Sequence, residues 1–205
     1  MLKGMSILKI ARMGHPVLRQ VALPIAPEEV TSPHVQQLIE DMLATAIDAD
    51  GAGLAAPQVH APVRVVILSL DELEGFQVWI NPVITPLTED YMLTYEGCLS
   101  VEGLRGAVAR PARVHVQALD REGGIIDMEL DGFSAVVAQH ECDHLDGILY
   151  IDRLEPGTLM FLDEYRRFGP WPLGGYDEGD EEGIDEEGIG EDIIDDTIID
   201  EGGEE

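Results

Sequence analysis

The sequence predicts an α+β fold, in which β-hairpins form antiparallel sheet and two amphipathic helices pack with them. Apolar residues recur at helical spacing over residues 33–49 and again over 133–146. Two regions, 63–80 and 114–130, each contain a pair of strand-like segments joined by a short turn. With 205 residues, of which 45% are hydrophobic, the chain is large enough to bury a core of its own.

The first helix is predicted for residues 33–49. Ser32 is a favourable N-cap, and Pro33 suits the first helical position because the N–H that proline lacks has no helical partner there. The residues that recur at three- and four-residue spacing are Val35, Leu38, Ile39, Met42, Leu43, Ala46 and Ile47. Asp50-Gly51 ends the pattern, so we expect this stripe to face the core.

Small residues fill the next segment, Gly51 to Gln58, which reads GAGLAAPQ. Two glycines and three alanines leave room for another backbone to approach closely. A phosphate-binding loop is disfavoured, because no strand precedes the segment, no helix follows it and it lacks the Lys-Ser/Thr pair. We expect a strand or loop that lines a substrate site.

Two hairpins are predicted from β-branched and apolar residues. Residues 63–70 and 76–80 are joined by the polar stretch 71–75, and Asn81-Pro82 is expected to break the sheet after them. Val114, Val116 and Ala118 alternate with polar residues, and a turn at 120–124 leads into the second strand at 125–130.

The second helix, residues 133–146, carries two histidines on one face. His140 and His144 are four residues apart, so both imidazoles can reach a single metal ion. Glu141 lies about a quarter-turn round the helix, where its carboxylate can act on a water bound to that metal. Gly147 follows as a stop signal, and residues 157–168 could form a last helix. The pattern indicates a metal-dependent hydrolase.

A catalytic site of this kind needs a third protein ligand. Zinc peptidases with a longer motif place a histidine six residues further on, but Tyr150 stands there. Glu155 and Glu164 are candidates of the glutamate-ligand type. Cys98 is the better candidate, because a thiolate binds soft and borderline divalent ions strongly. The other cysteine, Cys142, points away from a metal held by the two histidines and is expected to pack in the core.

Charge divides the chain into two parts. Residues 177–205 hold 16 acidic and no basic residues, and the other 25 acidic residues against 12 basic ones leave −13 for residues 1–176. We therefore predict a catalytic domain at 1–172 and an acidic low-complexity tail at 173–205, disordered by composition. A net negative charge of this size argues against direct nucleic-acid binding. The absence of a long apolar run and of a targeting segment predicts a cytoplasmic protein without membrane association.

Three segments together resemble the peptide deformylase family: GAGLAAPQ (51–58), EGCLS (96–100) and QHECDHLDG (139–147). The resemblance runs from about Ile7 to Leu154, in the motif order and spacing of that family. It implies an α+β architecture of antiparallel β-sheets packed around the metal-binding helix. It also implies removal of the N-formyl group from the N-terminal formyl-methionine of newly synthesised proteins in the bacterial cytosol, with release of formate.

The resemblance implies a ligand set of Cys98, His140 and His144 for one divalent metal ion. The resemblance favours ferrous iron (Fe2+), the native metal of many family members, with Zn2+, Ni2+ or Co2+ as alternatives. By the same resemblance Glu141 activates the metal-bound water and returns its proton to the departing amine. The Gln58 amide and the backbone N–H of Leu99 would stabilise the oxyanion.

The substrate would pair as an extended strand with the small-residue segment. The positions that match the family's substrate-binding residues are Ala52, Gly53, Phe133, Val136 and Val137. Arg105 and Arg110 match retained arginines, for which an ion pair with Glu96 is the expected role. The expected partners are N-formyl-methionyl nascent peptides and transiently the ribosome, though not through the acidic tail, which RNA would repel.

Two alternatives remain open. A zincin-type peptidase would take its third ligand from a glutamate or histidine and would keep its metal without Cys98. A non-catalytic relative would bind metal or formyl-peptides and use the tail as an interaction module.

Overall fold

A computed structural model describes residues 4–70 and 73–170 of the chain. In these ranges the longer helices are α1 (Pro33–Asp48), α2 (Gly132–Leu145) and α3 (Leu162–Phe168). Single turns of 3-10 helix are η1 (Pro16–Arg19), η2 (Pro27–Glu29), η3 (Ala56–Val59) and η4 (Tyr150–Asp152). No helix in the described part of the chain is both long and apolar enough to span a bilayer. The predicted tail, 173–205, lies outside the described residues, so the division at residue 172 stays a prediction.

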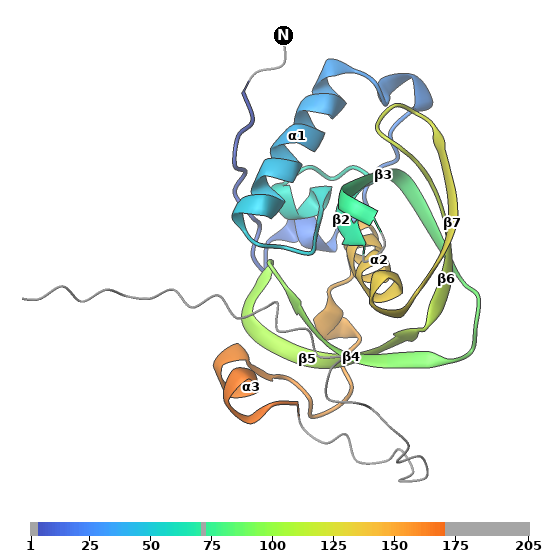
Figure 1. Ribbon diagram of the computed structural model, residues 1–205. Coiled ribbons are helices and arrows are strands. Elements are labelled where there is room, and N and C mark those ends of the chain that lie inside the picture. Colours follow the sequence, from blue (N-terminus) through green and yellow to red (C-terminus); the bar gives the residue numbers. More distant parts are fainter. Residues whose placement is uncertain (1–3, 71–72, 171–205) are drawn as a thin grey trace, which may run out of the picture. The chain divides into compact units, whose positions relative to one another are not determined.

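The strands form two antiparallel sheets within the described residues. The larger sheet has the order β1-β2-β3-β6-β7, with β1 at Gly53–Ala55, β2 at Val65–Leu70, β3 at Leu73–Pro86, β6 at Arg113–Leu119 and β7 at Ile125–Asp131. The smaller sheet has the order β4-β5-β8, with β4 at Tyr91–Cys98, β5 at Val101–Pro111 and β8 at Met160–Phe161. Figure 1 shows the sheets curving around α2, which lies between them, with α1 on the far side of β2. The predicted α+β fold is confirmed.

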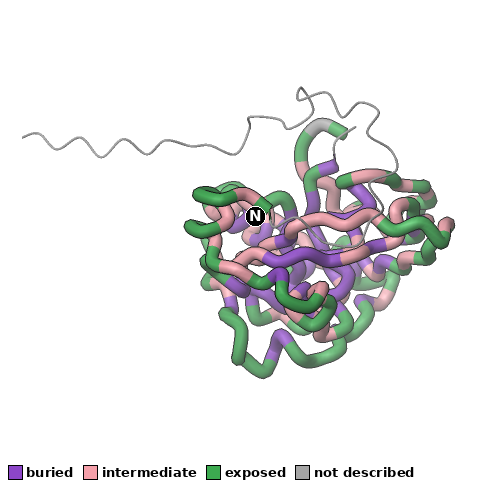
Figure 2. Tube along the Cα trace, turned by 90° about the horizontal axis from the view of Figure 1, so that it is seen from below, coloured by how far each residue is buried: buried purple, intermediate pink, exposed green. Residues whose placement is uncertain are grey.

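Strand β2 explains how both helices are held. Val66 and Leu68 belong to a buried cluster that includes α2 residues, whereas Val65 and Ile67 belong to a second cluster with α1. Alternate side chains of a strand point to opposite faces, so residues 65–68 of β2 are all apolar because both faces of the strand are covered there. The buried segments gathered at the centre of Figure 2 are consistent with this arrangement.

The predictions for the first two helices are confirmed to within one residue at each end. The Ser32 hydroxyl accepts a hydrogen bond from the Val35 N–H, and Pro33 opens α1 as expected. Helix α2 begins at Gly132 and ends at Leu145, one residue from the prediction at each end. The last predicted helix is only partly correct: residues 157–161 form a turn and β8, and α3 begins at Leu162.

The predicted break at Asn81-Pro82 is wrong, because β3 runs through it to Pro86. A β-bulge lies there, between the Ile80–Leu119 and Val83–Gln117 pairs with β6, and it accommodates a proline without an N–H donor. Asn81 takes a left-handed φ of 53°, and its side chain bonds the backbone N–H and carbonyl of Ile25. The β4–β5 hairpin was not predicted, and it delivers Cys98 to the site.

Candidate metal centre

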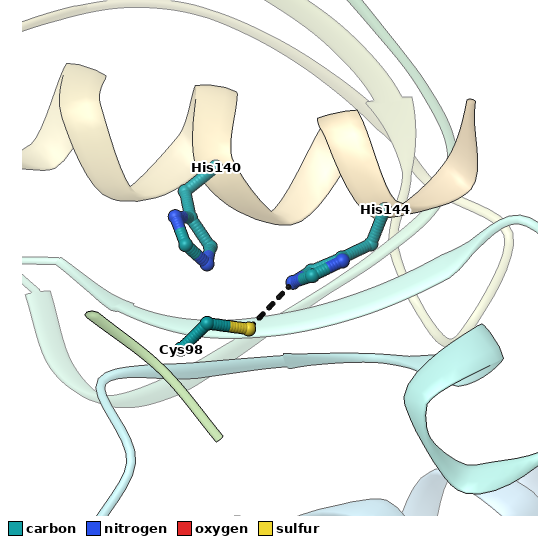
Figure 3. A group of neighbouring side chains, drawn as sticks. All are labelled: Cys98, His140 and His144. Atoms are coloured by element: carbon teal, nitrogen blue, oxygen red, sulfur yellow. Dashed lines mark hydrogen bonds between the residues drawn. The ribbon is translucent and has the colours of Figure 1, made fainter. Parts of the chain in front are cut away.

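Three side chains of metal-ligand type converge from two elements. His140 and His144 project from one face of α2, and Cys98 reaches them from the end of β4 (Figure 3). One ligand atom from each residue lies within 4.8 Å of the other two. The Cys98 Sγ and the His144 Nε2 are 3.3 Å apart. Residues 42 positions apart in the sequence therefore meet in one cluster, and Glu155 and Glu164 are not part of it.

The spacing of these atoms fits a tetrahedral ion. Metal–sulfur and metal–nitrogen bonds of about 2.3 and about 2.1 Å at a tetrahedral angle separate sulfur from nitrogen by about 3.6 Å. The observed 3.3 Å between Sγ and Nε2 is close to that separation. One thiolate and two imidazoles also form a donor set that suits borderline divalent ions such as iron, nickel, cobalt and zinc.

A second layer of side chains orients His140. Its Nδ1 lies 2.8 Å from the Glu96 Oε2. An ionised carboxylate only accepts hydrogen bonds, so Nδ1 carries the proton and Nε2 keeps its lone pair for a metal. Glu96 in turn accepts hydrogen bonds from the Arg110 Nε and Nη2 at 2.5 and 2.9 Å. Burial would raise the pKa of Glu96, but the bonds from Arg110 and His140 outweigh it and lower that pKa.

Arg110 continues this network to the surface. Its Nη1 donates to Asp143 at 2.9 Å, and Arg153 donates to both oxygens of Asp143 at 2.7 and 2.8 Å. Sequence reasoning assigned no role to Asp143 or Arg153. Asp143 and Arg153 lie 47 and 57 positions after Glu96 in the sequence, and only the fold connects them to it. The ion pair predicted for Glu96 is made by Arg110, whereas Arg105 lies across Gly97.

The electrostatics of the cluster favour a bound cation. Burial opposes protonation of His140, but Cys98 and Glu96 beside it raise the pKa of its imidazole well above the ordinary value. An environment that favours a proton at this point favours a metal ion for the same reason. Burial and the neighbouring positive charges lower the pKa of His144 well below the ordinary value, so its imidazole is neutral and able to coordinate.

Glu141 is buried beside the cluster, with 5% of its surface exposed. Burial raises the pKa of its carboxyl to about 7. Its Oε2 has no hydrogen-bond partner among the described residues. The other carboxylate oxygen, Oε1, lies beside Gly53, where an added Cβ would be 2.5 Å from it. A buried carboxyl with a free oxygen and a pKa near neutrality can take up and release a proton.

The remaining predicted site residues lie at different depths. Gln58, on η3, is 1% exposed, and its Nε2 lies 3.5 Å from the Cys98 Sγ. Leu99 is half-buried and packs against the α1 cluster. Phe133 is 52% exposed on the first turn of α2, while Val136 is buried. Val137 packs within the cluster that joins α2 to β2.

Three further observations complete the site. Ala52 is exposed and precedes β1, which is an edge strand of the larger sheet. Cys142 is buried, and burial raises the pKa of its thiol, which agrees with core packing. Two surface hollows elsewhere share no residue with the cluster; they are lined by Pro86, Leu87, Thr88, Glu89 and Tyr91, and by Gly157, Leu159, Met160, Phe161, Glu164 and Phe168.

Comparisons with known proteins all point to one family. The family model described as polypeptide deformylase matches residues 7–159. A peptide deformylase of Pseudomonas aeruginosa is 46% identical over 151 residues, which cover 73% of this chain and 88% of that protein. Peptide deformylase 1 of Nitrosomonas europaea is 41% identical over 168 residues, covering 78% and 90%.

Solved structures show the same similarity. A class I type b peptide deformylase from Acinetobacter baumannii with bound Met-Ala-Ser superposes with a TM-score of 0.70 and 34% identity, covering 74% of this chain and 100% of that chain. The peptide deformylase of Thermotoga maritima superposes with a TM-score of 0.69 and 35% identity, covering 73% and 99%.

Proposed function

The chain belongs to the peptide deformylase family, and we propose that Cys98, His140 and His144 hold the divalent metal on which this family depends. The family's activity is hydrolysis of the formyl group from N-formyl-methionyl peptides, and this is the activity of the chain. Neither a zincin-type peptidase nor a non-catalytic relative is favoured by the comparisons. The observation that carries the ligand assignment is the convergence of one thiol and two imidazoles beside a buried, unpaired carboxylate oxygen.

The bound metal supplies Lewis-acid chemistry, which polarises the formyl carbonyl and makes a water molecule nucleophilic near neutral pH. Ferrous iron is our first choice among iron, zinc, nickel and cobalt, and the thiolate-and-imidazole donor set is compatible with each of them. Glu96 holds His140 in the tautomer that leaves Nε2 available. Arg110 keeps Glu96 ionised and in place.

Glu141 is the proposed general base and then general acid. Its carboxylate takes a proton from the attacking water and gives it to the departing amine nitrogen as the C–N bond breaks. A pKa raised to about 7 by burial suits both transfers, because neither protonation state is strongly preferred at neutral pH. The Gln58 amide and the Leu99 N–H are the proposed donors to the formyl oxygen as negative charge develops on it.

The peptide is proposed to extend β1. Among the described residues this strand ends the larger sheet, so its outer edge can pair with an extended chain. Ala52 and Gly53 lie at its start, and Phe133, Val136 and Val137 are the proposed wall for the methionine side chain. The Met-Ala-Ser bound to the Acinetobacter relative is a peptide of the kind that deformylation releases.

Substrate chemistry suggests where the enzyme works. Formyl-methionine stands at the start of a chain that is still leaving the ribosome, so we expect the enzyme to act in the bacterial cytosol with brief access to ribosomes. We do not assign that contact to the acidic tail, because its charge repels RNA.

The deciding experiment measures formate release from a formyl-methionyl tripeptide by protein purified without oxygen and loaded with iron, nickel or cobalt. We expect turnover by the wild-type chain and a loss of at least about a hundredfold in Glu141→Ala. Absence of turnover with every metal would refute the activity. Wild-type turnover by Glu141→Ala would refute the role of Glu141 alone.

A further inference from the structure

The Gln58 side chain is held at both ends of its carboxamide. Its Oε1 accepts a hydrogen bond from the Ala55 N–H at 2.7 Å. Its Nε2 donates to the Ser100 Oγ at 3.3 Å and to the Cys98 Sγ at 3.5 Å. A reversed amide would set an NH2 group against the Ala55 N–H, so the oxygen and nitrogen ends are assigned by their partners.

Ser100 is as deeply buried as Gln58, with 1% of its surface exposed. Its backbone N–H lies 3.4 Å from the Cys98 Sγ, and its carbonyl accepts from the Met13 N–H at 2.7 Å. The Gln58 carbonyl accepts from the Ala11 N–H, also at 2.7 Å. The segment 11–13 therefore hydrogen-bonds to the main chain at both Gln58 and Ser100, so the fold sets the separation between these two side chains.

We infer that the Ser100 hydroxyl is a positioning group for the reaction, because it sets the rotation of the Gln58 carboxamide. A primary amide has two N–H bonds. When one of them points at the Ser100 Oγ, the plane of the amide is fixed and the second N–H is aimed toward the Cys98 Sγ, on the metal-ligand side of the site where the formyl oxygen would lie. This inference rests on the proposed role of Gln58 as a donor to the formyl oxygen.

The Ser100→Ala substitution isolates this contact. It removes only the Oγ, and the main-chain contacts of residue 100 with Met13 and Cys98 remain. Loss of a whole oxyanion donor costs about a hundredfold to a thousandfold in kcat. A donor that is present but free to rotate should lose part of this, so we expect kcat to fall about tenfold. KM should change little, because the bond to the oxygen forms only in the transition state.

A double-mutant cycle provides the test. Formate release is measured for metal-loaded full-length wild type, Ser100→Ala, Gln58→Ala and the double variant. If Ser100 acts through Gln58, Ser100→Ala should lower kcat about tenfold in the wild-type background and by less than about twofold in Gln58→Ala. An equal loss in both backgrounds, or an unchanged kcat in Ser100→Ala, would overturn the inference.

Two readouts separate positioning from a structural role. The Co2+-loaded Ser100→Ala enzyme should keep the wild-type thiolate absorption bands, and a shift would mean that Ser100 acts through Cys98. Thr158→Ala is the matched control: Thr158 is 3% exposed, and its hydroxyl accepts from Ala107 and donates to Glu155. That variant should lose stability and keep its kcat. If it loses as much kcat as Ser100→Ala, the effect is structural.

If Ser100→Ala does not fold, Ser100→Cys provides the same test. Ser100→Cys keeps a side chain of similar length with a weaker acceptor, so its kcat should also fall, and an unchanged kcat would overturn the inference. The proposed function is tested separately by Gln58→Ala. If Gln58→Ala keeps the wild-type kcat, Gln58 is not a donor to the formyl oxygen. If Gln58→Ala has a low kcat but Ser100→Ala keeps the wild-type kcat, only the inference about Ser100 is refuted.

Discussion

The contact between Gly53 and Glu141 makes a sharp prediction for Gly53→Ala. An ideal Cβ at residue 53 would lie 2.5 Å from the Glu141 Oε1 and 2.7 Å from its Cδ and Cγ. Ordinary contacts of this kind are about 3.5 Å, so the carboxylate must move by about 1 Å. Gly53 does not have a positive φ, so alanine fits the backbone itself.

A displacement of about 1 Å in catalytic geometry costs about a hundredfold in rate, or about 2.7 kcal/mol of transition-state stabilisation. We therefore expect kcat for formate release by Gly53→Ala to fall about a hundredfold. Metal content should be unchanged, because the three atoms nearest to the new methyl all belong to Glu141. Gly4→Ala is the control, since its added methyl meets nothing within 4 Å.

Binding measurements can refute this reasoning. Gly53 was predicted to allow close approach of the peptide backbone, which is a different explanation for the glycine. In the Glu141→Ala background the three colliding atoms are absent, so adding Gly53→Ala should change the Kd for a formyl-methionyl peptide by less than about threefold. A large loss of affinity in that background would show that the methyl obstructs the peptide and not Glu141.

Three other predictions concern the metal, its supporting residues and stability. Cys98→Ala should abolish stoichiometric metal binding, measured by elemental analysis, and full occupancy would remove Cys98 from the ligand set. Glu96→Gln should weaken metal affinity about tenfold to a hundredfold in a chelator competition, while Arg113→Ala, which breaks an exposed ion pair, should not; equal effects would contradict the network argument. The Arg19 hydrogen bond lowers the pKa of Asp152, so the stability it contributes is present above the unfolded-state value of 3.8 and is lost as pH falls below it. The Tm of Asp152→Asn should accordingly fall less than that of the wild type on acidification, and parallel curves would refute this assignment.

Local signals were sufficient for the helices. Ser32 and Pro33 start α1, the apolar stripe defines its buried face, and these features act within a few residues of one another. The same holds for the pair His140 and His144, whose common face follows from helical geometry.

The errors share a physical cause. Asn81-Pro82 has the local signature of a strand end, but pairing with β6 on both sides of a bulge continues β3 through it. The partner strand lies more than thirty residues away, and nothing near Asn81 reports it. The β4–β5 hairpin was missed because strand pairing depends on partners that a local pattern does not reveal.

The sequence by itself determined the helices, most of the larger sheet, the family resemblance and the types of residue that do the chemistry. Only the tertiary structure decided how those residues support one another. The fold orients His140 through its hydrogen bond to Glu96, and it places Gly53 in contact with Glu141. It also holds the Gln58 amide by hydrogen bonds to Ala55 and Ser100. These contacts join segments of different elements. They depend on distances and orientations created when α2 is buried between the sheets, which a linear pattern of residue types does not contain.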